Sequence, residues 1–226
     1  MDLKQSVKQA ANTLGIKGRL KKVQSKAIND GLDGHDLLVV APTSFGKSAI
    51  FQILALIKHG LTIIVVPTLS LLHDQVEQLQ QSDISVGFCS SDVLSWDESD
   101  MQSALDQYGY LLLYTTPESL WKLDLSDISV SLLVVDECHC VTSWGYGFRK
   151  AYLEIGSFID SLSHRPQVIA LTATAPIEAR EQIKQLLHMK HVSEHTVSLY
   201  RPKLTFSSYS FVSEEARQQK LKHLLK

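Results

Sequence analysis

Short apolar runs alternate with amphipathic stretches along most of the chain. The apolar runs, which predict strands, occupy residues 37–41, 61–66, 84–88, 110–114, 132–135 and 167–171. The stretches with helical periodicity occupy residues 3–14, 23–32, 46–59, 69–81, 97–108, 149–163 and 176–189, and Ser213 before two glutamates is typical of the N-cap of a final helix. This alternation predicts an α/β fold, with a mainly parallel β-sheet and helices on both faces.

Composition says less about fold and function than the pattern of apolar and polar residues does. The 226 residues, 44% of them hydrophobic, indicate a soluble globular chain of one or two domains, and a net charge of −2 does not indicate a nucleic-acid partner. Cys89, Cys138 and Cys140 occur without a secretory signal or an apolar run long enough to cross a bilayer. We therefore expect free thiols, no membrane partner, and a cytoplasmic location, at the nucleoid in a bacterium, or a nuclear one in a eukaryote.

A phosphate-binding loop is predicted in the segment VVAPTSFGKS, residues 39–48, where an apolar strand meets a helix. Backbone N–H groups in such a loop face inward, and the N-terminus of the following helix favours anions. Lys47 would reach the β- and γ-phosphates, and the Ser48 hydroxyl would ligate Mg²⁺. The other residues expected to surround the nucleotide are Thr43, Ser44, Phe45 and Gly46. A chance Gly-Lys-Ser before a helix is the alternative for the loop taken alone.

The segment VVDECH, residues 134–139, supplies acidic groups that suit the other half of a nucleotide-hydrolysis site. Its apolar part predicts a buried strand that ends at the rim of a parallel sheet, where such sheets bind ligands. Asp136 would hold Mg²⁺ through water, Glu137 would orient or deprotonate the attacking water, and His139 would sense the γ-phosphate. Together with the phosphate loop, this segment predicts a nucleotide-hydrolysis site that uses Mg²⁺. A solvated strand end is the alternative.

Further segments agree in order and spacing with a known family. They are LKKVQSKAI around Gln24, VVPTLSLLHDQ (65–75), YTTPESL (114–120), ALTATA (170–175) and YRPKL (200–204). With the two segments above, they resemble the first RecA-like P-loop domain of superfamily 2 DEAD/DEAH-box helicases, and in particular RecQ-type DNA helicases.

The resemblance implies a role for each segment. Gln24 would read the adenine edge, with Lys21 in place of the family's usual arginine. Thr68, Ser70, Thr116 and Pro117 would contact single-stranded DNA, and Thr172 and Thr174 would couple hydrolysis to movement. Two positions of the phosphate loop depart from the general pattern, since Ala41 replaces the first glycine and Ser44 stands where many helicases carry another.

The segment HCVTSWGYGFRKAYLEI, residues 139–155, resembles the aromatic-rich loop of RecQ proteins. Trp144, Phe148 and Arg149 would offer flat faces and a cation to single-stranded DNA, with stacking on the order of 1–3 kcal/mol per base. The alternative, that the two aromatic side chains belong to the core, is disfavoured by Gly145 and Gly147, which suggest a loop. Zinc is not expected at Cys138-His139-Cys140, because adjacent residues cannot readily surround one tetrahedral ion.

We expect residues 1–212 to form the ATP-binding domain, and residues 213–226 to begin a linker helix towards a second RecA-like domain. The resemblance implies that this second domain supplies arginines to the γ-phosphate, and no such motif occurs in the sequence. This indicates a fragment, or a protein that takes its second lobe from another chain. Alone, the chain is expected to bind nucleotide and hydrolyse it weakly without unwinding; the complete motor would move 3′ to 5′ and act on single strands and duplex junctions.

Two other functions stay open. One is a P-loop ATPase without a nucleic-acid role, and the other is a non-catalytic module that binds nucleic acid or protein. The basic residues Lys17, Arg19, Lys21, Lys22 and Lys26 do not decide between them, because such a cluster can either touch DNA or form a solvated face.

Overall fold

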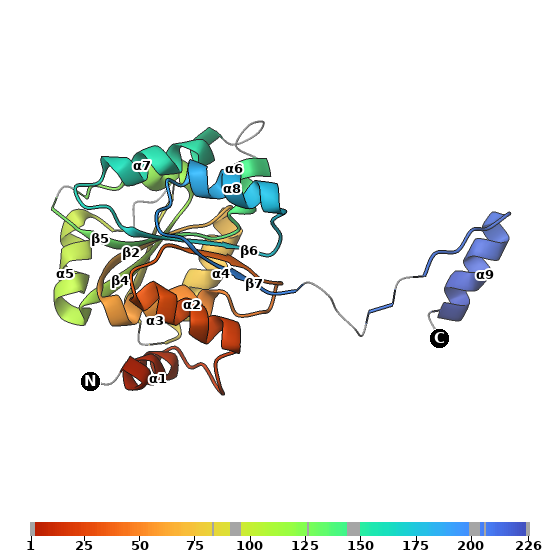
Figure 1. The fold of residues 1–226 in the computed structure, drawn as a ribbon, viewed down its shortest axis with the longest axis horizontal. Helices are drawn as coiled ribbons and strands as arrows, with labels where there is room; N and C mark the ends of the chain where they lie inside the picture. The colour runs from red at the N-terminus through yellow and green to blue at the C-terminus, as the bar shows by residue number, and fades with distance from the viewer. Residues whose placement is uncertain are drawn as a thin grey trace.

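A parallel sheet forms the centre of the domain (Figure 1). The computed structural model describes residues 3–82, 84–90, 96–125, 127–143, 150–198, 204–205 and 207–224, with the backbone alone at residue 143. Within these residues the sheet has seven strands in the order β3-β4-β2-β5-β6-β1-β7, and every neighbouring pair is parallel. The strands are β1 Leu37–Val40, β2 Gly60–Val65, β3 Val86–Cys89, β4 Tyr110–Thr115, β5 Val130–Val135, β6 Gln167–Thr172 and β7 Ser193–Thr196.

Helices cover both faces of the sheet (Figure 1). One face carries α1 Leu3–Thr13, α2 Lys22–Leu32, α3 Ser48–Lys58 and α4 Leu69–Gln80. The other carries α5 Glu98–Tyr108, the 3₁₀ helix η1 Pro117–Lys122, α6 His139–Ser143, the 3₁₀ helix η2 Lys150–Glu154, α7 Ile155–Ser161 and α8 Ile177–Leu186. The last helix, α9 Glu214–Leu224, has no buried residue and lies apart from the sheet (Figure 1).

Alternation along the strands explains why the apolar runs build two cores. Successive strand side chains point to opposite faces. In β1, Leu37 and Val39 therefore join the core under α1–α4, whereas Leu38 and Val40 join the core under the other helices. All four residues are buried, as a strand covered on both faces requires. The predicted α/β fold is confirmed.

The structure differs from the predicted elements at three places. Strand β7 was not predicted, because its sequence SEHT is polar and only His195 is buried, as befits an edge strand with one neighbour. The helix expected at 149–163 is in the described part a 3₁₀ turn followed by the shorter α7. Helix η1 was also missed. The Ser213 cap is confirmed, since its hydroxyl oxygen accepts a hydrogen bond from the Ala216 N–H at 3.3 Å.

The strand order brings distant segments to one end of the sheet. Strands β2, β5, β6 and β1 are consecutive neighbours, and all point the same way. Their carboxyl ends therefore place the start of α4, the acidic segment, the Thr172–Thr174 turn and the phosphate loop side by side. This is the edge at which open parallel sheets bind ligands.

At the amino-terminal ends of the strands, one buried carboxylate connects three segments. Asp36, 1% exposed, lies just before β1 and pairs with the Arg165 guanidinium before β6. It also accepts hydrogen bonds from the backbone N–H groups of Val168 at 2.9 Å and Lys190 at 2.7 Å. Asp36 thus connects the beginnings of β1 and β6 with the segment that leads into β7.

Cys89, Cys138 and Cys140 are free and buried. Across the described residues, no group of three His, Cys, Asp or Glu side chains is placed to hold a metal ion. Nor does any described helix combine the length and apolar character needed to span a membrane.

Candidate nucleotide site

The phosphate loop runs from Ala41 at the end of β1 to Lys47, which is the N-cap of α3. Gly46 has a φ of +84°, and a Cβ at this position would lie 2.8 Å from the Gln24 amide nitrogen. The positive φ therefore favours glycine here, and any side chain would also have to displace the Gln24 amide. The Lys47 ammonium donates to the Ala41 carbonyl at 3.2 Å, so its side chain folds back over the loop.

Ser44 is the strained residue of this loop. Its φ is +64°, a left-handed conformation that costs a non-glycine residue about 1–2 kcal/mol. We expect Ser44→Gly to raise the free energy of unfolding by about 1 kcal/mol, after glycine's freedom in the unfolded chain offsets part of the gain. Urea unfolding measures this change. Thr43→Gly is the matched control, because Thr43 is not among the positive-φ residues and its replacement should destabilise the fold. A less stable Ser44→Gly protein would contradict the prediction.

Gln24 and Lys21 hold the phosphate loop from the side of α2. The Gln24 amide nitrogen donates to the carbonyls of Gly46 at 2.9 Å and Phe45 at 3.3 Å, while its oxygen accepts from the Lys21 N–H at 2.7 Å. The Lys21 ammonium donates to the Phe45 carbonyl at 2.7 Å and lies 4.3 Å from the centre of the Phe45 ring. The Gln24 amide is thus engaged within the protein, and its reading of adenine stays a prediction.

Glu137 lies between two basic groups. Its carboxylate is 3.9 Å from the Lys47 ammonium and 3.3 Å from Nδ1 of His139. The hydrogen bond with His139 and the charge of Lys47 lower the pKa of Glu137 despite its partial burial. Contacts with the Cys140 sulfur and with Glu137 raise the pKa of His139 to about 10. Glu137 is therefore an anion between two cations at neutral pH, and its φ of +48° shows a strained backbone.

Asp136 is held on both carboxylate oxygens. One oxygen accepts from the Glu137 N–H at 3.0 Å, and the other accepts from the Gln75 side-chain amide at 3.2 Å. Burial and the neighbouring Glu137 charge raise the pKa of Asp136. A cation bound beside it would remove that penalty, and the carboxylate and the Ser48 hydroxyl are the hard oxygen ligands that Mg²⁺ prefers. The residues present therefore fit a magnesium site.

Thr172 links three parts of the site. Its hydroxyl lies 3.0 Å from Nδ1 of His139 and accepts a hydrogen bond from the Thr174 N–H at 3.2 Å. Its carbonyl accepts a hydrogen bond from the N–H of Ala41, the first residue of the phosphate loop, at 3.0 Å. The structure thus brings Thr172, predicted from its sequence motif, against the acidic segment and the phosphate loop, and Thr174 is hydrogen-bonded to Thr172.

The residues predicted to contact nucleic acid fall into three groups. Thr68, half-buried, and Ser70, exposed, lie at the start of α4 with their hydroxyls 3.1 Å apart, and Thr68 caps the helix. Thr116 and Pro117 are buried, and the Thr116 hydroxyl donates to Ser119, so neither side chain is available to a strand in this structure. The aromatic loop residues Trp144, Phe148 and Arg149, together with the segment 200–203, lie outside the described residues.

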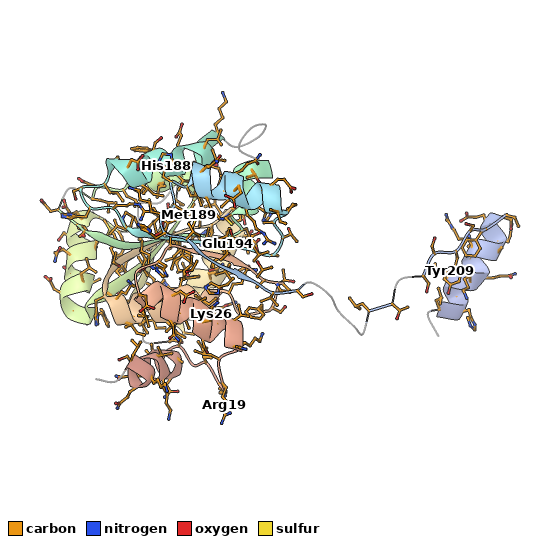
Figure 2. The ribbon with its side chains drawn as sticks, in the orientation of Figure 1. Arg19, Lys26, His188, Met189, Glu194 and Tyr209 are labelled. Atoms are coloured by element: carbon orange, nitrogen blue, oxygen red, sulfur yellow. The ribbon has the colours of Figure 1, made fainter. Side chains whose placement is uncertain are left out.

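The basic residues near the N-terminus are all exposed. Arg19 projects from the segment between α1 and α2, away from the rest of the domain (Figure 2). Exposed lysines and arginines of this kind are compatible with a solvated face and with a contact with DNA.

Comparison with known proteins bears on the same segments. The family model described as DEAD/DEAH box helicase matches residues 21–183, which include the phosphate loop, the acidic segment and the Thr172–Thr174 turn. The chain belongs to the DEAD/DEAH box helicase family. The matched range contains Lys47, Asp136 and Glu137, which the contacts above join into one continuous site.

Within this helicase family, the chain is similar to RecQ-type proteins, as the sequence predicted. It is 35% identical over 192 residues to the ATP-dependent DNA helicase RecQ of Haemophilus influenzae, covering 83% of this chain and 31% of that protein. It is 36% identical over 189 residues to the probable ATP-dependent DNA helicase RecS of Bacillus subtilis, covering 81% of this chain and 38% of that protein. The chain thus spans about a third of the length of these relatives.

A solved structure supports the helicase fold independently. The Pyrococcus furiosus Hef helicase domain superposes with a TM-score of 0.58 at 23% identity, over 80% of this chain and 39% of that one. At this identity the likeness concerns the fold alone.

Sequence reasoning missed Gln75 as a partner of Asp136. The available signal was a polar residue on the buried side of α4, three positions after Leu72 and one before Val76.

Proposed function

We propose that this chain is the ATP-binding domain of a DNA helicase that uses ATP hydrolysis to translocate 3′ to 5′ on single-stranded DNA and to unwind duplexes. The observation that carries the proposal is the continuous set of contacts from Lys47 through Glu137 and His139 to Thr172. These contacts join the phosphate loop to the acidic segment and to the turn predicted to transmit hydrolysis. The names of the RecQ-type relatives support the choice of DNA as substrate.

The geometry suggests what each group does when nucleotide binds. The Lys47 ammonium, which now contacts the Ala41 carbonyl and Glu137, would turn to the β- and γ-phosphates. Its departure would remove one of the cations that lower the pKa of Glu137 and so make that carboxylate a better proton acceptor for the attacking water. Ser48 and Asp136 would hold magnesium, which neutralises developing charge on the phosphates. His139 would stay hydrogen-bonded to Thr172 and report the state of the γ-phosphate.

The domain organisation is part of the proposal. Residues 1–212 would form the first RecA-like domain, and the helix that follows Ser213 would lead towards a second one that completes the site. Helix α9 exposes Leu221 and Leu224, which such a partner domain would cover. Without that domain the chain would bind nucleotide and hydrolyse it weakly, but it would not separate strands.

The test is ATP turnover with and without a single-stranded oligonucleotide, on this chain and on the full-length protein. We expect strong DNA stimulation in the full-length protein only, and a loss of about 10²-fold or more in Lys47→Ala, because the ammonium stabilises phosphate charge. Lys8→Ala, an exposed residue of α1, is the control. ATP turnover without any DNA effect would favour a P-loop ATPase with another role. DNA-stimulated turnover that survives in Lys47→Ala would favour a non-catalytic module whose apparent activity comes from elsewhere.

A further inference from the structure

Gln75 interrupts the apolar face of α4. Leu72, Val76 and Leu79 of this helix are buried in the core, and Gln75 lies on the same side by helical spacing. An apolar residue would satisfy the pattern at this position. Polar residues that break a packing pattern are concentrated at functional sites, so the contacts of Gln75 are informative.

The Gln75 amide nitrogen donates to Asp136 at 3.2 Å. Its carbonyl oxygen is buried and accepts no hydrogen bond from the described residues. Because this side chain breaks the apolar face of α4 and its amide nitrogen serves Asp136, the contact is better explained by the function of Asp136 than by packing.

We propose that Gln75 is a positioning residue for the magnesium side of the nucleotide site. It fixes one Asp136 oxygen while the Glu137 N–H fixes the other, so the carboxylate is oriented before a cation arrives. Partners of this kind around metal-binding carboxylates typically change metal affinity by 10–100-fold when they are removed. This inference rests on the proposed function.

The same helix carries the residues predicted to contact single-stranded DNA. Thr68, which is half-buried, caps α4, and Ser70 lies exposed in its first turn. Gln75 follows Thr68 by seven residues, about 10 Å along the helix axis. A shift of α4 when a strand binds Thr68 and Ser70 would therefore change the Gln75–Asp136 contact directly. Helix α4 would thus link the bound DNA strand to the cation site by a route that does not involve the aromatic loop.

The test compares Gln75→Leu and Gln75→Asn with Gln78→Asn, an exposed glutamine of the same helix. Mn²⁺ serves as the probe, and its binding to the protein–ADP complex is followed by electron paramagnetic resonance. We expect Mn²⁺ affinity to fall by about 10-fold in both Gln75 variants. ADP binding in EDTA and the urea unfolding midpoint should stay within the range of the control. If Gln75→Leu does not fold, Gln75→Asn, which shortens the side chain by one methylene, carries the test.

A second readout concerns the link to DNA. Adding an oligo-dT strand should change Mn²⁺ affinity in the wild type and in Gln78→Asn, but not in the Gln75 variants. Equal Mn²⁺ affinity in all proteins would overturn the positioning role, and an unchanged DNA effect in the Gln75 variants would overturn the link through α4. If the wild type binds no ADP or Mn²⁺ at all, the proposed function itself fails, which separates the two cases.

Discussion

Glu137→Gln should reduce ATP hydrolysis by about 10²–10⁴-fold while leaving ATP binding close to that of the wild type. The replacement keeps the size of the side chain but removes its ability to accept a proton. Glu137 is the acidic group that lies within reach of both Lys47 and His139. Its loss should therefore affect the chemical step more than the binding of phosphate.

The effect is measured on the full-length protein, as single-turnover hydrolysis in the presence of single-stranded DNA and as equilibrium binding of a fluorescent ATP analogue. Glu77→Gln, an exposed glutamate of α4, is the control and should hydrolyse ATP normally. If Glu137→Gln turned over ATP within threefold of the wild type, Glu137 would have no part in activating water. The role would then pass to another group at the edge of the sheet.

An NMR titration gives a readout that does not depend on activity. The contact with Glu137 is one cause of the raised pKa of His139, after the contact with Cys140. Removing the Glu137 charge should lower the pKa of His139 from about 10, because a cation is less stable without the neighbouring anion. His139 would then lose its proton at a lower pH in Glu137→Gln than in the wild type.

The sequence predicted those parts of the site that are contiguous in the chain. Each of these parts is a short contiguous stretch that follows an apolar strand: the phosphate loop, the acidic segment and Thr172–Thr174. The local sequence pattern was therefore enough to find them. The strand order then brings them together, as the position of such motifs at strand ends implies.

The contacts that were not predicted join residues far apart in the sequence. The Gln75–Asp136 hydrogen bond spans 61 positions and the Arg165–Asp36 pair spans 129. The local pattern of apolar and polar residues cannot predict contacts between residues so far apart. The engagement of Gln24 with Gly46 was missed for the same reason, and strand β7 was missed because a polar edge strand has no apolar signature.

Asp36→Ala should lower the free energy of unfolding by about 3–5 kcal/mol, the usual effect of breaking a buried ion pair from one side. The side chain is 2% exposed and binds both nitrogens at the end of the Arg165 side chain as well as two backbone N–H groups. Without it, the N–H groups of Val168 and Lys190 lose this acceptor, and the Arg165 guanidinium loses its anionic partner while keeping the carbonyls of Pro166 and His188. Urea unfolding followed by circular dichroism measures the change.

Two controls separate this structural role from the function of the site. Asp33→Ala removes an exposed carboxylate three residues away, and its effect should stay within about 0.5 kcal/mol. Arg165→Ala should destabilise less than Asp36→Ala, because Asp36 keeps its two backbone donors. Since Asp36 precedes β1 and the nucleotide site follows it, folded Asp36→Ala protein should bind nucleotide normally at low temperature. A loss of stability below about 1 kcal/mol would mean that the pair contributes little to joining β1, β6 and the approach to β7.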